Sequence, residues 1–161
     1  MNQGTFGAVE RTRSLLAICQ REAHYLHRTN QRLFSAPITA SHIRRLPEDD
    51  ALSERVDAFV TRFGRLQDAI GDKLLPVFLR LMEEIPGAML ENLDRVERLG
   101  LVESADDWIA IRKLRNRMIH EYMTGPDELA DALNAAHDYV PTLQNTLDKI
   151  IERIGRRYSD L

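Results

Sequence analysis

Residues 108–122 read W-I-A-I-R-K-L-R-N-R-M-I-H-E-Y, and their apolar side chains have the spacing of an amphipathic helix. At about 100° per residue, the large apolar side chains gather in one broad sector that we expect to be buried. That sector holds Trp108, Ile111, Leu114, Met118, Ile119 and Tyr122. Arg112, Asn116 and His120 follow its edge as an i, i+4, i+8 stripe, and Arg115 falls inside the sector. The stretch therefore predicts a helix that buries one face and carries polar and basic groups along its margin.

The same helical spacing recurs in the first half of the chain. Apolar or small residues three and four positions apart predict one long helix over about residues 7–33. The segment 35–50 contains two prolines and is expected to be a loop. Ser53 has the side chain of an N-cap and is predicted to open a second helix. Pro76 should kink or break that helix, and the dipeptide 86–87, Pro-Gly, should end it.

Helix-end signals organise the second half. A short helix over residues 88–99 is expected to close at Gly100, in the C′ position. Ser104 with Asp107 three residues later has the spacing of a capping box, which opens the helix that contains residues 108–122. A last helix follows, with an apolar stripe over residues 129–154.

Together these elements predict an all-α fold, an antiparallel up-and-down bundle of four to five helices. We expect one domain over residues 1–161. Residues 1–50 would supply the long helix and the loop, and residues 53–161 the bundle that carries the basic stretch.

Composition limits the class of protein. The chain has 161 residues, 43% of them hydrophobic and 29% charged, which is typical of a globular domain. No apolar run approaches the roughly 20 residues that span a bilayer, so no membrane association is expected. No export signal pattern is visible at the N-terminus, and the single cysteine, Cys19, excludes an internal disulfide framework and fits a reducing compartment. The expected location is cytoplasmic.

The sequence shows no cofactor or metal motif. It has no Cys-x-x-Cys pair, Walker loop or G-x-G-x-x-G pattern, so no cofactor is predicted. His24 and His27 are three positions apart on the first predicted helix, but a solvated helix face explains them better than a metal site. No metal site is predicted.

Arg115 is the residue that breaks the local pattern. A guanidinium group on an apolar sector must find an anion, because leaving it unpaired costs several kcal/mol. Two explanations remain open from the sequence. The anion is a phosphate of a nucleic acid, or it is an acidic residue of a neighbouring helix, such as Asp68 or Asp72.

The residues around Arg115 favour polyanion chemistry. Four basic side chains besides His120 lie between residues 112 and 120, in a chain whose formal net charge is -3. His120 stands close to a Gly-Pro helix stop, where the helix dipole favours a protonated ring. A histidine that exchanges a proton beside an arginine that keeps its charge can serve phosphodiester cleavage.

Residues 114–122 resemble the HEPN superfamily of α-helical ribonucleases, whose signature is R-x4-6-H. The pattern R-x4-H-x-Y, formed by Arg115, His120 and Tyr122, is most similar to the HepT toxin branch. The resemblance is specific to this short stretch and is supported elsewhere only by the helical outline.

The resemblance implies an activity and partners. HEPN ribonucleases are homodimers whose two motifs line a shared cleft, and they cleave RNA without a metal through the ribose 2′-hydroxyl. By that match Arg115 and His120 would be catalytic, and Asn116 with Arg112 would bind the substrate. In HepT toxin–antitoxin systems an MntA-like nucleotidyltransferase silences the toxin by AMPylation of the motif tyrosine, which is Tyr122 here.

Two other functions fit the same residues. One is a non-catalytic HEPN module that binds and positions a partner nucleotidyltransferase. The other is a helical dimer in which Arg115 forms a structural ion pair and no nucleic acid is bound.

Overall fold

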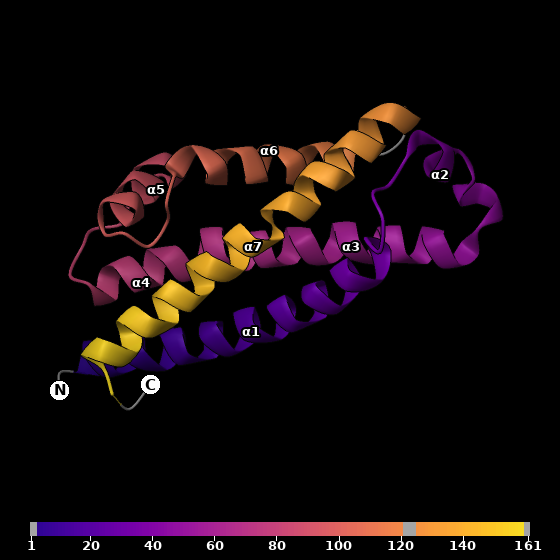
Figure 1. Ribbon diagram of the computed structural model, residues 1–161. Helices are drawn as coiled ribbons and strands as arrows, with labels where there is room; N and C mark the ends of the chain where they lie inside the picture. Colours follow the sequence, from indigo (N-terminus) through magenta and orange to yellow (C-terminus); the bar gives the residue numbers. More distant parts are fainter. Residues whose placement is uncertain (1–2, 121–124, 160–161) are drawn as a thin grey trace.

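The computed structural model describes residues 3–120 and 125–159, and every regular element in these two ranges is a helix (Figure 1). The elements are α1 (Gln3–Leu33), α2 (Ala40–Arg44), the 3-10 turn η1 (Leu46–Glu48), α3 (Asp50–Asp68), the π-helical segment η2 (Ala69–Leu74), α4 (Leu75–Leu81), α5 (Met89–Arg98), α6 (Ala105–His120) and α7 (Pro126–Arg157). The all-α prediction is confirmed. The described ranges hold more helical elements than the four or five expected, because short helices occupy segments predicted to be loop or helix end.

The long helices pack around one axis. The rod formed by α3, η2 and α4 runs antiparallel to α1, α6 lies along the other side of α3, and α7 crosses the assembly diagonally (Figure 1). One hydrophobic core draws on α1, α3, α6 and α7, with Phe59, Phe63, Phe78 and Trp108 fully buried. The N-terminal helix shares this core through residues such as Leu26, so it packs as part of the bundle.

The segment between α1 and α3 differs from the prediction. Residues 35–50 were expected to be a loop but contain α2, which Thr39 opens with a reciprocal capping box. The Thr39 hydroxyl accepts the backbone N–H of His42 at 3.3 Å, and His42 Nδ1 accepts that of Thr39 at 3.0 Å. The predicted N-cap at Ser53 is also wrong, since α3 begins at Asp50 and Asp49 Oδ1 accepts the Leu52 N–H at 3.0 Å.

Pro76 was expected to kink or break this helix, but the helical path continues from α3 through η2 into α4. The backbone instead widens into η2 before α4, and the Leu75 N–H bonds to the carbonyl of Ile70, five residues back. A proline ring clashes with the carbonyl four residues before it in a regular α-helix, and the wider π turn provides space for that ring. The rod then ends at Leu81, ahead of the predicted Pro-Gly stop, and Glu83 adopts a left-handed conformation with φ 63°.

The predictions for α1, α5 and the turn after α5 are confirmed. Gly100 takes φ 76° after α5, and the Leu101 N–H bonds to the Val96 carbonyl at 2.9 Å, as in a Schellman ending. Among the described residues, none of the helices has the length and apolar character to cross a membrane.

Candidate functional site

Capping residues position the start of α6, the helix that carries the motif. The Ser104 hydroxyl accepts the backbone N–H of Asp107 at 3.3 Å, which confirms this contact of the predicted capping box. The Glu97 carboxylate accepts the N–H of Ala105 at 2.6 Å and ties α6 to α5. Asp106 in the first turn complements the helix dipole. The helix therefore has a fixed start, from which the register of the motif follows.

The buried face of α6 is narrower than the sequence suggests. Trp108, Ile111, Leu114 and Met118 are buried, as expected, but Ile119 is 43% exposed. The helix packs against α3 and α7, and Ile119 lies at the edge of the contact with α3, beside Gly64. The predicted burial of Ile119 is therefore wrong.

Arg115 lies at the seam between α6 and α3. Its Nη2 donates to Asp68 Oδ2 at 3.0 Å, and its Nη1 donates to Asn116 Oδ1 at 3.1 Å. The aliphatic stem passes over Gly64, where an added Cβ would meet the Arg115 Cγ at 3.5 Å. The Arg115 side chain is 28% exposed and that of Asp68 is 36% exposed. The guanidinium therefore reaches solvent although its stem is covered.

A second arginine–aspartate pair lies one turn away. Arg112 Nη1 donates to Asp72 Oδ1 at 2.9 Å, with side chains 45% and 39% exposed. Asp72 belongs to η2, so the π segment provides the carboxylate that holds Arg112. Pairs as exposed as these contribute about 0–1 kcal/mol to stability, since water and salt screen them. Their main effect is to orient two guanidinium groups along one edge of the bundle.

The sequence-predicted residues are partly brought together. Arg112, Arg115 and Asn116 lie along the same edge, and the backbone of His120 belongs to the described part of α6. Asn116, predicted to contact substrate, here accepts a hydrogen bond from Arg115. Tyr122 and the side chain of His120 lie outside the described part of the chain.

One guanidinium nitrogen of Arg115 lacks a partner among residues 3–120 and 125–159. This nitrogen, Nε, is buried and makes no hydrogen bond within those ranges, although a buried donor normally finds an acceptor. Gln67, one turn before Gly71, is also buried with both polar side-chain atoms unpaired. Gln67 was not among the residues predicted from the sequence, although a polar residue on the apolar stripe of a helix is a detectable exception.

Gly71 in η2 lies where the core residue Trp108 packs against the π-helical backbone. A Cβ built at Gly71 would lie 3.2 Å from Trp108 Cζ3 and 3.2 Å from Gln67 Nε2, closer than most real contacts. The glycine therefore allows the indole to approach the π-helical backbone. Trp108 Nε1 donates to Thr146 Oγ1 at 3.1 Å and thereby joins α6 to α7 as well.

Neither the single cysteine nor a metal cluster offers a second reactive site among residues 3–120 and 125–159. Burial, reinforced by the nearby carboxylate of Glu22, raises the pKa of Cys19 to about 12, so its thiol stays protonated at neutral pH. No group of three His, Cys, Asp or Glu side chains within residues 3–120 and 125–159 is arranged to hold a metal ion.

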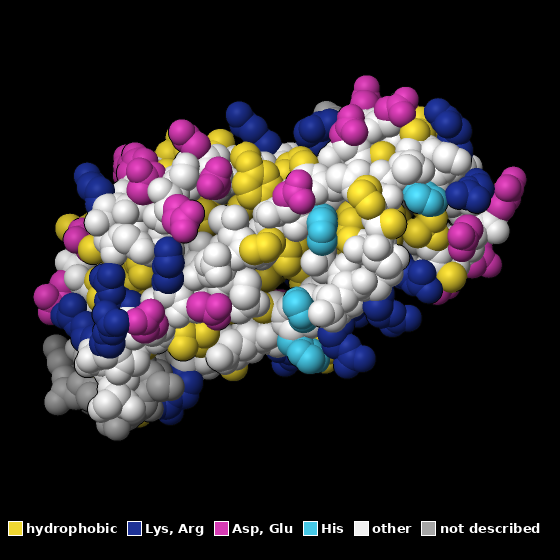
Figure 2. All heavy atoms as spheres, viewed as in Figure 1, with side chains coloured by type: hydrophobic (Ala, Val, Ile, Leu, Met, Phe, Trp, Pro, Cys, Tyr) yellow, Lys and Arg dark blue, Asp and Glu magenta, His cyan; other side chains and the backbone are white. Residues whose placement is uncertain are grey.

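The surface charge is mixed. Figure 2 shows acidic and basic side chains interspersed over the visible face, with histidines near its middle. Two of the five histidines, His27 and His137, line a cavity of about 420 Å³ between α1 and α7. His137 stacks on Phe34 with ring centroids 4.3 Å apart, and its Nδ1 lies 2.7 Å from Asn30 Oδ1. His137 is therefore held in the cavity wall by its contacts with Phe34 and Asn30.

No family model matches this chain, and neither the curated proteins nor the solved structures contain a significant match to it. Its functional interpretation therefore depends on the geometry of α6 and on the short motif.

Proposed function

We propose that the protein is a metal-independent endoribonuclease of the HEPN type, a HepT-like toxin of a toxin–antitoxin system. The observation that carries the proposal is the edge of α6. Arg115 is anchored by Asp68 and Asn116, remains open to solvent, and stands five residues before His120. An arginine held in place and a histidine five residues later in the sequence are the two kinds of group that metal-free phosphodiester cleavage uses.

The chemistry follows from the two groups. The ribose 2′-hydroxyl attacks the adjacent phosphorus, the 5′-oxygen of the next nucleotide leaves, and a 2′,3′-cyclic phosphate forms. A histidine ring can exchange protons with the entering or leaving oxygen near neutral pH. The guanidinium of Arg115 would neutralise the charge that develops on the phosphorane, and Arg112 would bind a neighbouring phosphate.

We also propose that the protein forms a homodimer through the edge that carries Arg115. Ile119 exposes a large apolar side chain beside Arg115, at the edge that faces away from the core. A second copy that packs there would cover Ile119 and bring two motifs into one cleft, where RNA would bind. The proposed cleft is thus composite, with each protomer contributing Arg115 and His120.

The Arg115–Asp68 pair supports a second function class, in which Arg115 is structural and no RNA is bound. The two roles predict different outcomes when Asp68 is replaced with asparagine. If Arg115 contacts phosphate, Asp68→Asn frees the guanidinium, so RNA affinity should stay within about three-fold of wild type or increase, and stability should change by less than about 1 kcal/mol. Arg115→Ala should instead reduce RNA binding and cleavage by at least about ten-fold.

Fluorescence anisotropy with a labelled single-stranded RNA and urea denaturation measure these two effects. Asp94→Asn is the matched control, because Asp94 is exposed on α5, away from the α6 edge. Equal loss of stability in Asp68→Asn and Arg115→Ala, with RNA binding unchanged in both, would establish the structural role instead.

Control by a partner enzyme is the second part of the proposal. AMPylation of Tyr122 by an MntA-like nucleotidyltransferase would place a phosphodiester charge two residues beyond His120. That phosphate would compete with RNA for Arg115, so the modified protein should bind and cut RNA poorly. Tyr122→Phe should keep most of the cleavage activity and escape silencing.

Mass spectrometry of the protein co-expressed with an MntA-like nucleotidyltransferase tests this prediction. Wild type should gain the mass of AMP on Tyr122, and Tyr122→Phe should gain none and remain toxic. Silencing of both proteins without added mass would contradict AMPylation. It would favour a non-catalytic module that binds the nucleotidyltransferase if RNA cleavage is also absent.

A further inference from the structure

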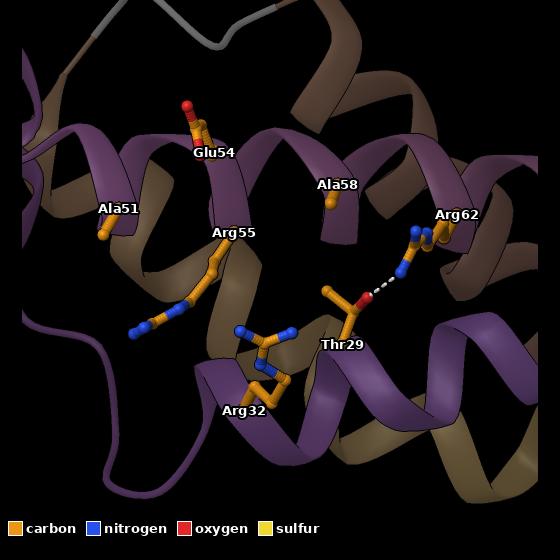
Figure 3. Close-up of a pocket in the computed structure, with 7 residues that line it drawn as sticks. All are labelled: Thr29, Arg32, Ala51, Glu54, Arg55, Ala58 and Arg62. Atoms are coloured by element: carbon orange, nitrogen blue, oxygen red, sulfur yellow. Dashed lines mark hydrogen bonds between the residues drawn. The ribbon is translucent and has the colours of Figure 1, made fainter.

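A basic hollow lies between the C-terminal part of α1 and residues 51–62 of α3 (Figure 3). Its volume is about 260 Å³, and three arginines line it, Arg32 from α1 with Arg55 and Arg62 from α3. α6 packs on a different side of α3, so this hollow is separate from the edge that carries Arg115 (Figure 1). The role proposed for the α6 edge therefore does not explain why three arginines line this hollow.

Small side chains create the space. Ala51, Arg55, Ala58 and Arg62 follow one another at intervals of four, three and four residues, which places all four on the same face of α3. On this face alanines alternate with arginines, so the long side chains flank positions that hold only a methyl group. The arrangement leaves a recess with cationic walls.

Arg62 is fixed in place. Its Nη1 donates to the hydroxyl of Thr29, drawn as the dashed line in Figure 3, and to the carbonyl of Tyr25 at 3.3 Å. The guanidinium carbon also lies 5.4 Å from the centre of the Tyr25 ring. These partners are neutral, and Arg62 has no ion pair with a carboxylate in the part of the chain that the structure describes.

Arg32 and Arg55 have no carboxylate partner among residues 3–120 and 125–159. Their side chains extend into the same space from facing helices, as Figure 3 shows. Glu54 also lines the hollow, but its carboxylate forms no ion pair with Arg32 or Arg55. Like charges facing one recess repel, and an anion between them would convert that repulsion into attraction.

We propose that this hollow binds a compact phosphate-bearing anion, a diphosphate group either free or on a nucleotide. Guanidinium groups bind phosphate oxygens in pairs of parallel hydrogen bonds, and three of them around one recess match a ligand with several phosphate oxygens. In Figure 3 the three side chains follow one another along the recess, with Arg32 between Arg55 and Arg62. The volume of about 260 Å³ suits a compact anion with several phosphate oxygens better than a nucleic-acid strand. The proposal does not depend on the ribonuclease activity.

Isothermal titration of the full chain with inorganic pyrophosphate, and separately with ATP, tests the site at constant ionic strength without divalent cations. Arg55→Gln and Arg32→Gln should each weaken binding by at least about ten-fold, because each removes charge-assisted hydrogen bonds. Arg65→Gln is the matched control, since it makes the same change on α3 outside the hollow and should bind within about two-fold of wild type. Tighter binding of ATP than of pyrophosphate would identify a nucleotide, and equal binding a free diphosphate.

Thermal unfolding separates ligand binding from a structural role. Without anion, Arg55→Gln should unfold at or above the wild-type temperature because like-charge repulsion is relieved, and pyrophosphate should raise the unfolding temperature of wild type but not of the variant. The proposal is overturned if pyrophosphate and ATP fail to bind at millimolar concentration, if Arg65→Gln loses as much affinity as Arg55→Gln, or if only RNA is affected by these variants. RNA cleavage should be unchanged in Arg55→Gln, so failure here is distinguishable from failure of the ribonuclease proposal.

Discussion

Replacing His120 with alanine should lower the rate of RNA cleavage by about 100- to 10,000-fold, the usual contribution of a general acid–base group. The alanine cannot accept or donate the proton that the 2′-hydroxyl mechanism transfers, whereas the arginines along α6 still bind the phosphate. RNA affinity should therefore change much less than the rate. Single-turnover cleavage of a labelled RNA, with binding measured in parallel, separates the two quantities.

His24→Ala is the matched control for this prediction. His24 is exposed on α1, and its ring contact is with the adjacent Tyr25. The control should cleave at the wild-type rate, and circular dichroism should show that both variants keep their helices. If His120→Ala cleaves as fast as His24→Ala, His120 has no role in proton transfer.

Replacing Trp108 with alanine should lower the free energy of unfolding by about 3–5 kcal/mol, as expected for a large aromatic side chain removed from a packed core. Trp108 is 1% exposed, packs against the backbone at Gly71, and donates to Thr146. The truncation leaves a cavity between α6, η2 and α7. Because Trp108 is the single tryptophan, urea unfolding must be followed by circular dichroism.

Trp108→Phe distinguishes packing from hydrogen bonding. Phenylalanine refills most of the cavity but cannot donate to Thr146, whose own hydroxyl still bonds to the Thr142 carbonyl at 2.9 Å. The loss should therefore be clearly smaller than that of the alanine variant. A loss below about 1 kcal/mol for Trp108→Ala would show that Trp108 does not hold α6 in place.

The helical class was predictable from the sequence because the spacing of apolar residues is a local property. The start of α6 and the glycine after α5 followed from side chains that act within a few residues of themselves. The start of α3 was missed because Asp49 and Ser53 both have cap-forming side chains, and their sequence context does not rank them. Local chemistry thus predicts helices better than it predicts their first residues.

The π segment could not be predicted because it depends on contacts between distant parts of the chain. Pro76 signals a disturbed backbone, but a kink, a break and a π turn are all responses to it. The packing of Trp108 against Gly71 accompanies the π turn in the folded chain. η2 in turn provides Asp72, the partner of Arg112.

The candidate site was predictable in part. The helical pattern showed that Arg115 is a charged residue on an apolar sector, and Asp68 was one of its predicted partners. In the structure these two residues form an ion pair. The register between α3 and α6 is a tertiary property, so the sequence could not choose between an acidic residue and an external phosphate. The exposure of Ile119 was missed for the same reason, because a helical wheel does not define how much of a face its neighbours cover.

The most direct test of the ribonuclease proposal is cleavage of single-stranded RNA by the purified protein in the presence of EDTA, with chemical analysis of the new ends. We expect cleavage without added metal and fragments that end in 2′,3′-cyclic phosphate or 3′-phosphate. Absence of cleavage under these conditions, a requirement for added magnesium, or fragments with 3′-hydroxyl ends would contradict it.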